Sequence, residues 1–370
     1  MDLVTLVSLL NASVLSVAIL GCLMFIITPA YRGVCILLGL VILATLTNIL
    51  EDLHISRELH LISPVFMLGY GPAFYLAAKR LIIGPVDYRS ALHFLPMLLA
   101  LPFTDHPQTI IALGTLWRMV YALLTLQLII GFNQQLSMQR SDANEVSLTW
   151  LGWLVGVSTL FSALDLFRLN FQPELGAHLN MIGYATSLFI FLMVLFSLIL
   201  ILNHRRVGLE TIASSIALPS TIITSASSGD EAKERAESAA DYQPLFAILD
   251  NEVRTQNWYT HPRITLNQLS DLSGLSTRDI SRSINLVAQM SFNDYINQHR
   301  VEHIKRSLAG HAKDYKINLT DLALAAGFSS KATFNQAFKK ATGMTPSEYR
   351  GVQQTQHVQN QDSDRLISRK

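Results

Sequence analysis

Charged residues are scarce in this chain: they make up 15% of its 370 residues, whereas hydrophobic residues make up 50%. Soluble domains carry about a quarter charged residues, so this average excludes an ordinary soluble protein over the whole length. The deficit is concentrated in residues 1–202, which contain long runs of Leu, Ile, Val, Phe and Ala. Residues 203–370 have the composition of a soluble domain. The sequence therefore predicts two parts in different surroundings.

Cysteine is also scarce, and the usual enzyme motifs are missing. Cys22 and Cys35 lie in apolar runs and form no CxxC or Cys/His pattern, which favours small buried hydrophobes over metal ligands. We therefore expect no metal site and no cofactor. The sequence contains no GxSxG, no HExxH and no glycine-rich phosphate loop after a strand, so it predicts no enzyme.

The apolar part contains seven segments close to the length of about 20 residues that crosses a bilayer. These segments are 3–27, 33–50, 62–82, 92–104, 110–133, 149–170 and 178–202. Lipid offers no hydrogen-bond partners to the backbone, so each segment should be a helix. The fourth is the weakest, because it is short and contains Pro96 and Pro102. The predicted fold is all-α, with a seven-helix transmembrane sensory domain over residues 1–206.

The basic residues of the connecting loops set the orientation, because Lys and Arg collect on the cytoplasmic side. With the N-terminus outside, the inner loops carry seven basic residues and the outer loops carry two. The inner ones are Arg32, Lys79, Arg80, Arg89, Arg140, Arg205 and Arg206, and the outer ones are Arg57 and Arg168. This count predicts a multi-pass protein of the bacterial inner membrane, with residue 203 onward in the cytoplasm.

Two charged residues, Arg118 and Asp165, lie inside predicted spans, where charge is costly and usually faces the interior of the bundle. Both fall at a similar depth in the outer part of the membrane. Two interpretations stay open: a buried salt bridge that fixes helix packing, or a polar pocket that binds a signal. The predicted pocket consists of Arg118 and Asp165 bordered by Asn48, Glu51, Asp52 and Tyr70.

A polar stretch separates the apolar part from the next domain. Residues 207–240 are rich in Ser, Thr and Ala and predict a flexible cytoplasmic linker. The segment GDEAKERAESAA within it has no apolar face, so it favours at most a weak helix. As a flexible coil the linker would span roughly 30 Å. Residues 352–370 predict a disordered polar tail.

Two helix-turn-helix patterns follow in tandem, and the first is TLNQLSDLSGLSTRDISRSINLV, residues 265–287. Gly274 suits the left-handed turn between the two helices, and Ser276 suits the cap of the second helix. Ile280, Ile284 and Val287 give that second helix a buried stripe. Its other face carries the candidate DNA contacts Arg278, Ser281, Arg282 and Asn285.

The second pattern is NLTDLALAAGFSSKATFNQAFKK, residues 318–340. Gly327 takes the turn, Ser329 or Ser330 caps the second helix, and Phe334 and Phe338 pack inward. Asn and Gln on the outer face bind adenine bidentately, and Lys near the helix C-terminus contacts phosphate. The candidate DNA contacts are Ser330, Lys331, Thr333, Asn335, Gln336 and Lys339.

The segment SFNDYINQHRVEHIKRSLAG, residues 291–310, predicts one amphipathic helix between the two patterns. Its apolar residues on helical spacing are Phe292, Tyr295, Ile296, Val301, Ile304 and Leu308. Such a helix would hold the two reading helices at a fixed separation, and about 34 Å places them in successive major grooves on one face of DNA. A solvated polar face would explain one motif, but two in tandem favour DNA binding.

The stretch GFSSKATFNQAFKKATGMTPSEYR, residues 327–350, resembles the signature of AraC/XylS-type transcriptional regulators. Its matching positions are Gly327, Phe328, Phe334, Phe338, Lys339, Gly343, Pro346, Tyr349 and Arg350. The resemblance covers about 241–351 and implies a seven-helix DNA-binding module. It also implies which residues contact bases, and these are Arg278, Ser281 and Arg282 in the first motif and Lys331, Ala332 and Gln336 in the second.

One position departs from the family pattern. The glycine that usually ends the first reading helix is replaced by Gln289. A left-handed turn at Gln costs about 1 kcal/mol more than at Gly, so the end and tilt of this helix are open. Asp279 on the same helix would repel phosphate, and it either caps the helix or accepts a hydrogen bond from a cytosine amine.

The sequence therefore predicts a membrane-embedded, one-component transcriptional regulator. Its expected partners are double-stranded DNA at promoter sites, inner-membrane lipid and an unknown small-molecule or lipid signal, and a homodimer stays open. The alternative is a membrane receptor or transporter-like protein whose C-terminal module docks another protein, and the polar reading faces argue against it. An intramembrane enzyme is a third alternative, which the missing motifs disfavour.

Overall fold

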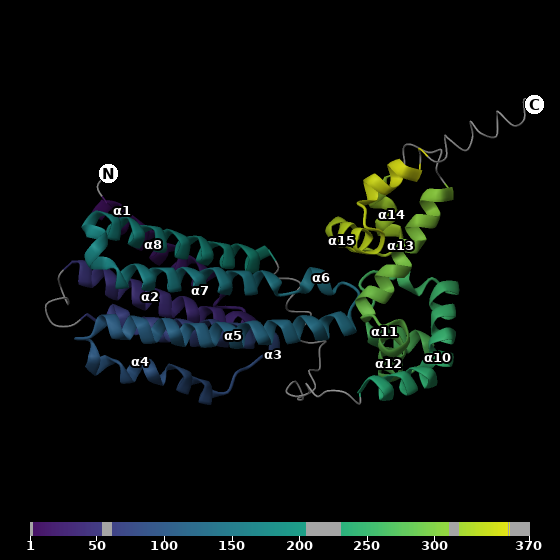
Figure 1. Ribbon diagram of the computed structural model, residues 1–370, viewed down its shortest axis with the longest axis horizontal. Helices are drawn as coiled ribbons and strands as arrows, with labels where there is room; N and C mark the ends of the chain where they lie inside the picture. Colours follow the sequence, from purple (N-terminus) through teal and green to yellow (C-terminus); the bar gives the residue numbers. More distant parts are fainter. Residues whose placement is uncertain (1–2, 54–60, 205–230, 311–317, 354, 356–370) are drawn as a thin grey trace, which may run out of the picture. The chain divides into compact units, whose positions relative to one another are not determined.

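The computed structural model describes residues 3–53, 61–204, 231–310, 318–353 and 355, and every regular element among them is helical (Figure 1). The chain divides into two compact units. The first comprises Met1–Phe132 and Leu148–Ile222, and the second comprises Asn133–Ser147 and Ile223–Lys370. Several predicted features lie outside the described residues: Arg57, Arg205, Arg206, most of the linker and most of the C-terminal tail.

The first unit is a bundle of long apolar helices. They are α1 (Leu3–Phe25), α2 (Arg32–Asp52), α3 (Met67–Ile83), α5 (Pro107–Gln139), α7 (Thr149–Asn170) and α8 (Gln172–His204). α1 packs against α2 and α8, α2 against α3, and α7 against α8. α5 approaches α3 closely at Gly71, where an added Cβ would lie 3.0 Å from the Cα of Arg118. The short helix η1 (Pro29–Tyr31) precedes α2.

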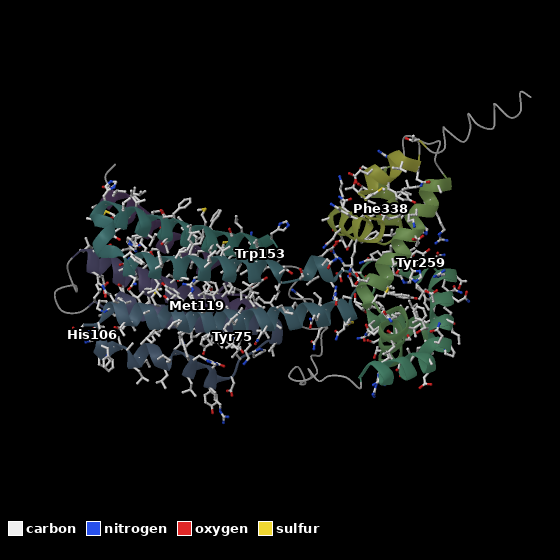
Figure 2. All side chains as sticks on the ribbon, viewed as in Figure 1. Tyr75, His106, Met119, Trp153, Tyr259 and Phe338 are labelled. Carbon is white, nitrogen blue, oxygen red and sulfur yellow. The ribbon has the colours of Figure 1, made fainter. Side chains whose placement is uncertain are left out.

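Five helices in the described part are long and apolar enough to cross a membrane. They are Leu3–Phe25, Pro29–Asp52, Pro107–Gln139, Ala143–Asn170 and Gly176–His204. Large apolar side chains point away from the bundle, including Leu23, Leu123 and Trp153, the last of which is 72% exposed on α7 (Figure 2). An apolar exterior of this extent is typical of helices that face lipid.

The predicted count of seven spans is not confirmed. The segment expected at 62–82 consists of η2 (Ser63–Phe66) followed by α3, whose 17 residues are short for a span. The segment expected at 92–104 is broken into η3 (Tyr88–Phe94), α4 (Leu95–Leu99) and η4 (Leu101–Phe103). Pro96 and Pro102 each stand at the start of one of these short helices. Proline cannot donate a backbone hydrogen bond and therefore interrupts a longer helix.

The second unit contains the tandem motifs. Its helices are α10 (Glu231–Thr255), η5 (Trp258–Thr260), α11 (Leu266–Ser273), α12 (Thr277–Ser283), the π turn η6 (Ile284–Ala288), α13 (Phe292–Gly310), α14 (Leu319–Ala325) and α15 (Lys331–Thr342). Residues 346–353 are also helical. With α10–α15 they give the seven helices that the resemblance implied. α10 begins within the stretch predicted as linker.

α13 joins two apolar cores. Phe292, Tyr295 and Ile296 on its first half belong to the core formed with α10, α11 and α12. Val301, Ile304 and Leu308 on its second half belong to the core formed with α14 and α15. The labelled side chains Tyr259 and Phe338 mark these two cores (Figure 2). The predicted amphipathic helix over 291–310 is therefore confirmed, and it connects the two motifs.

The second unit also contains a segment from the first half of the sequence. Residues 133–147 comprise the end of α5, a tight turn and the short helix α6 (Ala143–Val146). The amide of Ser141 donates to the carbonyl of Ile264 at 3.1 Å, and Arg140 forms an isolated antiparallel bridge with Thr265. Asn293 Nδ2 on α13 donates to the carbonyl of Ser141 at 2.7 Å. We call residues 133–147 the inserted segment, a feature that the domain prediction did not include.

The first reading helix ends at Gln289 in a left-handed conformation, with φ 54° and ψ 36°, after the π turn of η6. The chain thus keeps the left-handed turn that a glycine would make. This turn is strained, because a residue with a side chain disfavours the left-handed conformation. We predict that Gln289→Gly stabilises the second unit by roughly 0.5–1 kcal/mol, because the relieved strain exceeds the entropy that Gly adds to the unfolded chain. Hydrogen exchange of the α12 and α13 amides in the micelle-solubilised chain measures this.

The matched control is Gln298→Gly, at an exposed position inside α13. There glycine has no strain to relieve and should destabilise the helix by about 1 kcal/mol. If both substitutions lowered stability, strain at Gln289 would be ruled out.

Candidate functional site

Local hydrogen bonds fix the first helix-turn-helix motif. Thr265 and Gln268 form a capping box at the start of α11, and Gly274 ends that helix in a left-handed conformation, with φ 68°. Ser276 caps α12 by accepting a hydrogen bond from the amide of Asp279 at 3.1 Å. The Asp279 carboxylate in turn accepts from the Ser276 hydroxyl at 2.7 Å. Of the two roles considered for Asp279, the geometry favours the cap.

The buried and open faces of α12 match the predicted pattern except at Val287, which lies in η6 and is only half-buried. Ile280 and Ile284 are buried in the first core. Arg278 and Arg282 are exposed, and Ser281 and Asn285 are half-buried. Each of the four candidate DNA contacts of this motif therefore has at least part of its side chain accessible to solvent.

The second motif is held by a tighter turn. Gly327 has φ 94°, and a Cβ there would lie 2.6 Å from the carbonyl oxygen of Thr260. Ser330, rather than Ser329, caps α15 by accepting from the amide of Thr333 at 3.1 Å. The Ser330 hydroxyl is thus engaged within the helix end. α15 ends at Gly343.

One predicted DNA contact on α15 is buried and hydrogen-bonded to the inserted segment. Phe334 and Phe338 are buried as expected, but Thr333 is also buried, at 4% exposure. It belongs to the inward stripe with Phe334, Ala337 and Phe338, because residues three and four apart share a helix face. The remaining candidates on this helix are exposed, and they are Lys331, Ala332, Asn335, Gln336 and Lys339.

The inserted segment places a carboxylate at the start of α15. Glu145 Oε1 accepts hydrogen bonds from Ser329 Oγ and Thr333 Oγ1, each at 2.8 Å. The N-terminus of a helix carries partial positive charge and unpaired N–H groups, so it favours an anion such as a carboxylate or a phosphate. Sequence reasoning missed Glu145, since the contact joins residues almost 190 positions apart.

Arg300 on α13 binds several parts of the second unit together. It is 1% exposed, and its Nε and Nη2 donate to the carbonyls of Tyr259 and His261 at 2.8 and 2.9 Å. Nη2 also donates to Ser141 Oγ of the inserted segment at 3.3 Å. The guanidinium lies 5.5 Å from the ring centre of Phe328. Burial lowers the pKa of Arg300 to about 10, so the group stays charged at neutral pH.

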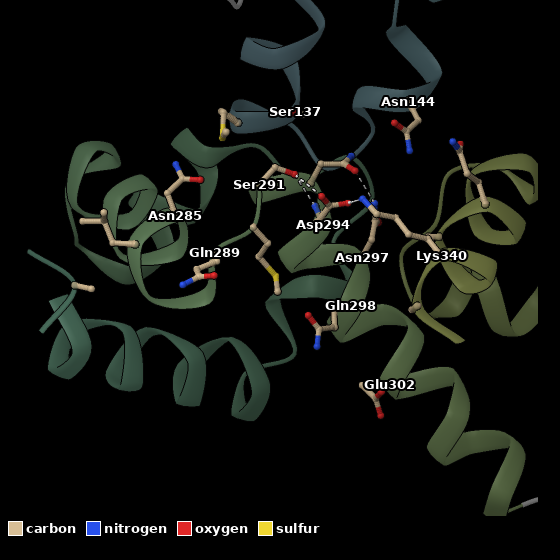
Figure 3. Close-up of a pocket in the computed structure, with 18 residues that line it drawn as sticks. Ser137, Asn144, Asn285, Gln289, Ser291, Asp294, Asn297, Gln298, Glu302 and Lys340 are labelled. Atoms are coloured by element: carbon tan, nitrogen blue, oxygen red, sulfur yellow. Dashed lines mark hydrogen bonds and ion pairs between the residues drawn. The ribbon is translucent and has the colours of Figure 1, made fainter. Parts of the chain in front are cut away.

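A polar cleft of about 1270 Å³ lies between the two motifs. Figure 3 shows Asn285 and Gln289 of the first motif, Lys340 of α15, and Ser137 and Asn144 of the inserted segment around it. Gln336 also lines the cleft. One candidate contact from each motif therefore opens on the same cleft, and the inserted segment forms part of its wall.

The first unit holds most of the predicted signal pocket. Asn48, Tyr70, Arg118 and Asp165 line one cavity of about 320 Å³. Glu51 does not line it. Its carboxylate instead accepts from the amide of Ser63 at 2.9 Å at the start of η2. Asp52 is also absent from the lining residues.

Arg118 and Asp165 do not pair with each other in the described structure, so the salt bridge, one of the two interpretations left open, is not observed. Asp165 pairs with Arg168 at 2.8 Å, whereas Arg118 Nη1 donates to Ser162 Oγ at 3.0 Å. The two charges thus share a cavity while engaging different partners.

Two capped helix pairs, each presenting an accessible polar helix face, define the second unit as a DNA-binding domain of helix-turn-helix type. Residues 269–351 match the family described as a helix-turn-helix domain. The C-terminal part of the chain is an AraC-type helix-turn-helix domain.

The relatives are similar over this domain alone. An uncharacterized HTH-type transcriptional regulator of Staphylococcus aureus (strain COL) is 35% identical over 91 residues, which are 25% of this chain and 12% of the relative. The melibiose operon regulatory protein of Escherichia coli (strain K12) is 30% identical over 91 residues, which are 25% of this chain and 29% of that protein. No solved structure shows significant similarity.

The accessible polar residues predict a specific pattern of binding defects. Arg282→Ala or Gln336→Ala should lose roughly 1–3 kcal/mol of discrimination at one base position each, because each removes a side chain suited to a base edge. Competition gel shifts with a library of single-base operator variants measure this loss.

The control is Gln256→Ala, which removes an exposed glutamine that lies beyond the end of α10 and outside both motifs. It should leave the base preferences unchanged. An equal loss on all sequences for the Gln336 variant would contradict its assignment to a base edge.

Proposed function

We propose that this protein is a membrane-embedded transcriptional regulator whose DNA-binding domain responds to a signal received by its apolar helices. The observation that carries the proposal is the inserted segment. The stretch that connects two membrane-competent helices, α5 and α7, belongs to the compact unit that contains both DNA-reading motifs. The alternative, a receptor whose C-terminal module docks another protein, does not explain why both motifs have polar reading faces.

The route from the signal to DNA follows one helix. α5 is continuous from Pro107 to Gln139, and it carries Arg118, which lines the cavity in the first unit. The turn that follows α5 contains Arg140 and Ser141, which contact α13 and Thr265 before α11. The next helix, α6, contains Glu145, which contacts Ser329 between α14 and α15. We infer that a shift or rotation of α5 changes the hold of the inserted segment on the DNA-binding unit.

Through Glu145, the contact between the inserted segment and the DNA-binding unit affects DNA binding directly. Its carboxylate occupies the N-terminus of α15, where a DNA phosphate would otherwise be favoured. A phosphate approaching that position meets a like charge, which costs on the order of 1 kcal/mol at close range in water. The engaged inserted segment therefore weakens DNA binding, and a signal that withdraws it strengthens binding.

We predict that Glu145→Gln tightens DNA binding about fivefold at low salt, because it removes roughly 1 kcal/mol of repulsion while the amide oxygen still accepts the same hydrogen bonds. Fluorescence anisotropy of labelled operator DNA with the full chain in nanodiscs measures the affinity.

The control is Asp241→Asn, which removes the same charge from an exposed position on α10. It should change the affinity much less. Equal effects of the two substitutions would show that net charge alone acts and that the position of Glu145 is irrelevant.

The membrane arrangement has its own test. We propose a multi-pass protein of the bacterial inner membrane, with the DNA-binding domain in the cytoplasm. A green fluorescent protein fused to the C-terminus should fluoresce, an alkaline phosphatase fused there should be inactive, and the chain should stay in the membrane pellet after carbonate washing. An active C-terminal phosphatase fusion or a chain released by carbonate would overturn the arrangement.

A further inference from the structure

The cavity in the first unit contains a buried cation with an unused donor. Arg118 is 5% exposed, and its guanidinium lies 5.7 and 5.8 Å from the ring centres of Tyr70 and Phe74. Nη1 donates to Ser162 Oγ at 3.0 Å. Nη2 is buried, and no group in the described part of the chain accepts a hydrogen bond from it. A buried charged donor without an acceptor is unfavourable, so this position suits an acceptor supplied by a ligand.

The charges around the cavity favour an anion. Among the described lining residues, Arg118 and Arg168 are cationic and Asp165 is anionic, which leaves one net positive charge. Asp165 is already engaged, since Oδ1 accepts from Arg168 Nε at 2.8 Å and from Ser187 Oγ at 3.1 Å. Arg168 Nη1 also donates to the carbonyl of Asn180 at 3.0 Å. Arg118 is therefore the cation whose charge an anionic ligand would balance.

The other polar groups of the cavity are neutral, and several of them form internal hydrogen bonds. Asn48 Nδ2 on α2 donates to the hydroxyl of Tyr184 on α8 at 2.7 Å, and lies 3.4 Å from Asn11 Oδ1 on α1. These amide and hydroxyl groups pair across three helices, while Asn11 Nδ2 is a neutral donor for which the described residues provide no acceptor. They leave the Arg118 end as the place where a charged group of a ligand would bind.

The rest of the wall is apolar and sets the size of the ligand. Its apolar members include Val14, Met67, Ile111, Phe161, Phe191 and Val194. The volume of about 320 Å³ lies at the lower end of the range of roughly 300–1,000 Å³ that small-molecule pockets have. Pockets with a largely apolar wall and a few fixed polar groups are typical of small-molecule sites.

We propose that this cavity binds a small organic monoanion, a carboxylate attached to an apolar body, with the carboxylate on Arg118. This inference rests on the proposed function in one respect: it identifies the ligand with the signal. Planar guanidinium and carboxylate groups match in geometry and form strong, charge-assisted hydrogen bonds. The apolar body of the ligand packs against the wall formed by α1, α3, α5, α7 and α8.

Binding of labelled decanoate to the full chain in nanodiscs tests the proposal, with empty nanodiscs subtracted. Decan-1-ol has the same apolar chain and no charge, so decanoate should bind at least about tenfold more tightly, as expected for a hydrogen bond to a charged group. 3-Phenylpropionate, an aromatic acid of the same charge, distinguishes a water-soluble aromatic ligand from a lipid-derived aliphatic one. Equal affinity for decanoate and decan-1-ol, or failure of both acids to bind, would overturn the proposal.

Arg118→Gln should reduce acid binding by at least about tenfold and leave decan-1-ol binding unchanged. Arg89→Gln, which removes an exposed arginine outside the cavity, should change neither. Should Arg118→Gln fail to fold, the comparison of decanoate with decan-1-ol on the unmodified chain still tests whether the cavity prefers an anion.

The readout on DNA separates this inference from the proposed function. Acid binding that alters operator affinity supports both. Acid binding with no change in operator affinity supports the site and contradicts its role as the signal. A response of Glu145→Gln without any acid binding supports the control of DNA binding and overturns the ligand class.

Discussion

The second unit depends on the hydrogen bonds that the buried guanidinium of Arg300 donates. A charge taken out of water must be matched by acceptors on every side, and Arg300 obtains them from the carbonyls before α11, from Asn297 on its own helix and from Ser141 of the inserted segment. Its face covers Phe328 beside the turn of the second motif. One side chain on α13 therefore fixes both DNA-reading motifs and the inserted segment against each other.

This arrangement explains how an apolar bundle and a DNA-binding domain can act as one regulator. The inserted segment continues directly from α5, and its Glu145 engages the end of α15 that favours anions. In the proposed mechanism, this carboxylate and a DNA phosphate compete for the same helix end, so binding of the segment and binding of DNA oppose each other. A ligand beside Arg118, which is also a residue of α5, acts in this mechanism on that competition through the same helix.

The sequence predicted the features that depend on local patterns. Residues a few positions apart predicted the cap at Ser276, the helix between the motifs and the buried phenylalanines. They left the second cap open between Ser329 and Ser330, and the structure places it at Ser330. The sequence also placed four of the six predicted pocket residues in one cavity, because charged groups inside apolar helices usually face the interior of the bundle. It missed two contacts between distant residues: Glu145 accepts a hydrogen bond from Thr333, and the inserted segment joins the second unit through contacts across more than 120 positions. It also missed a local pair, because Asp165 forms its ion pair with Arg168, three positions further on the same helix.

The central claim, that the inserted segment sits on the DNA-binding unit in the resting protein and leaves it when DNA binds, can be measured by cross-linking. With Cys22 and Cys35 replaced by serine, Glu145→Cys and Ser329→Cys would be placed in one chain in nanodiscs and treated with a short bismaleimide. We predict rapid cross-linking within the chain, slowed several-fold by operator DNA and not by unrelated DNA. Absence of the cross-link, or a rate that operator DNA leaves unchanged, would contradict the claim.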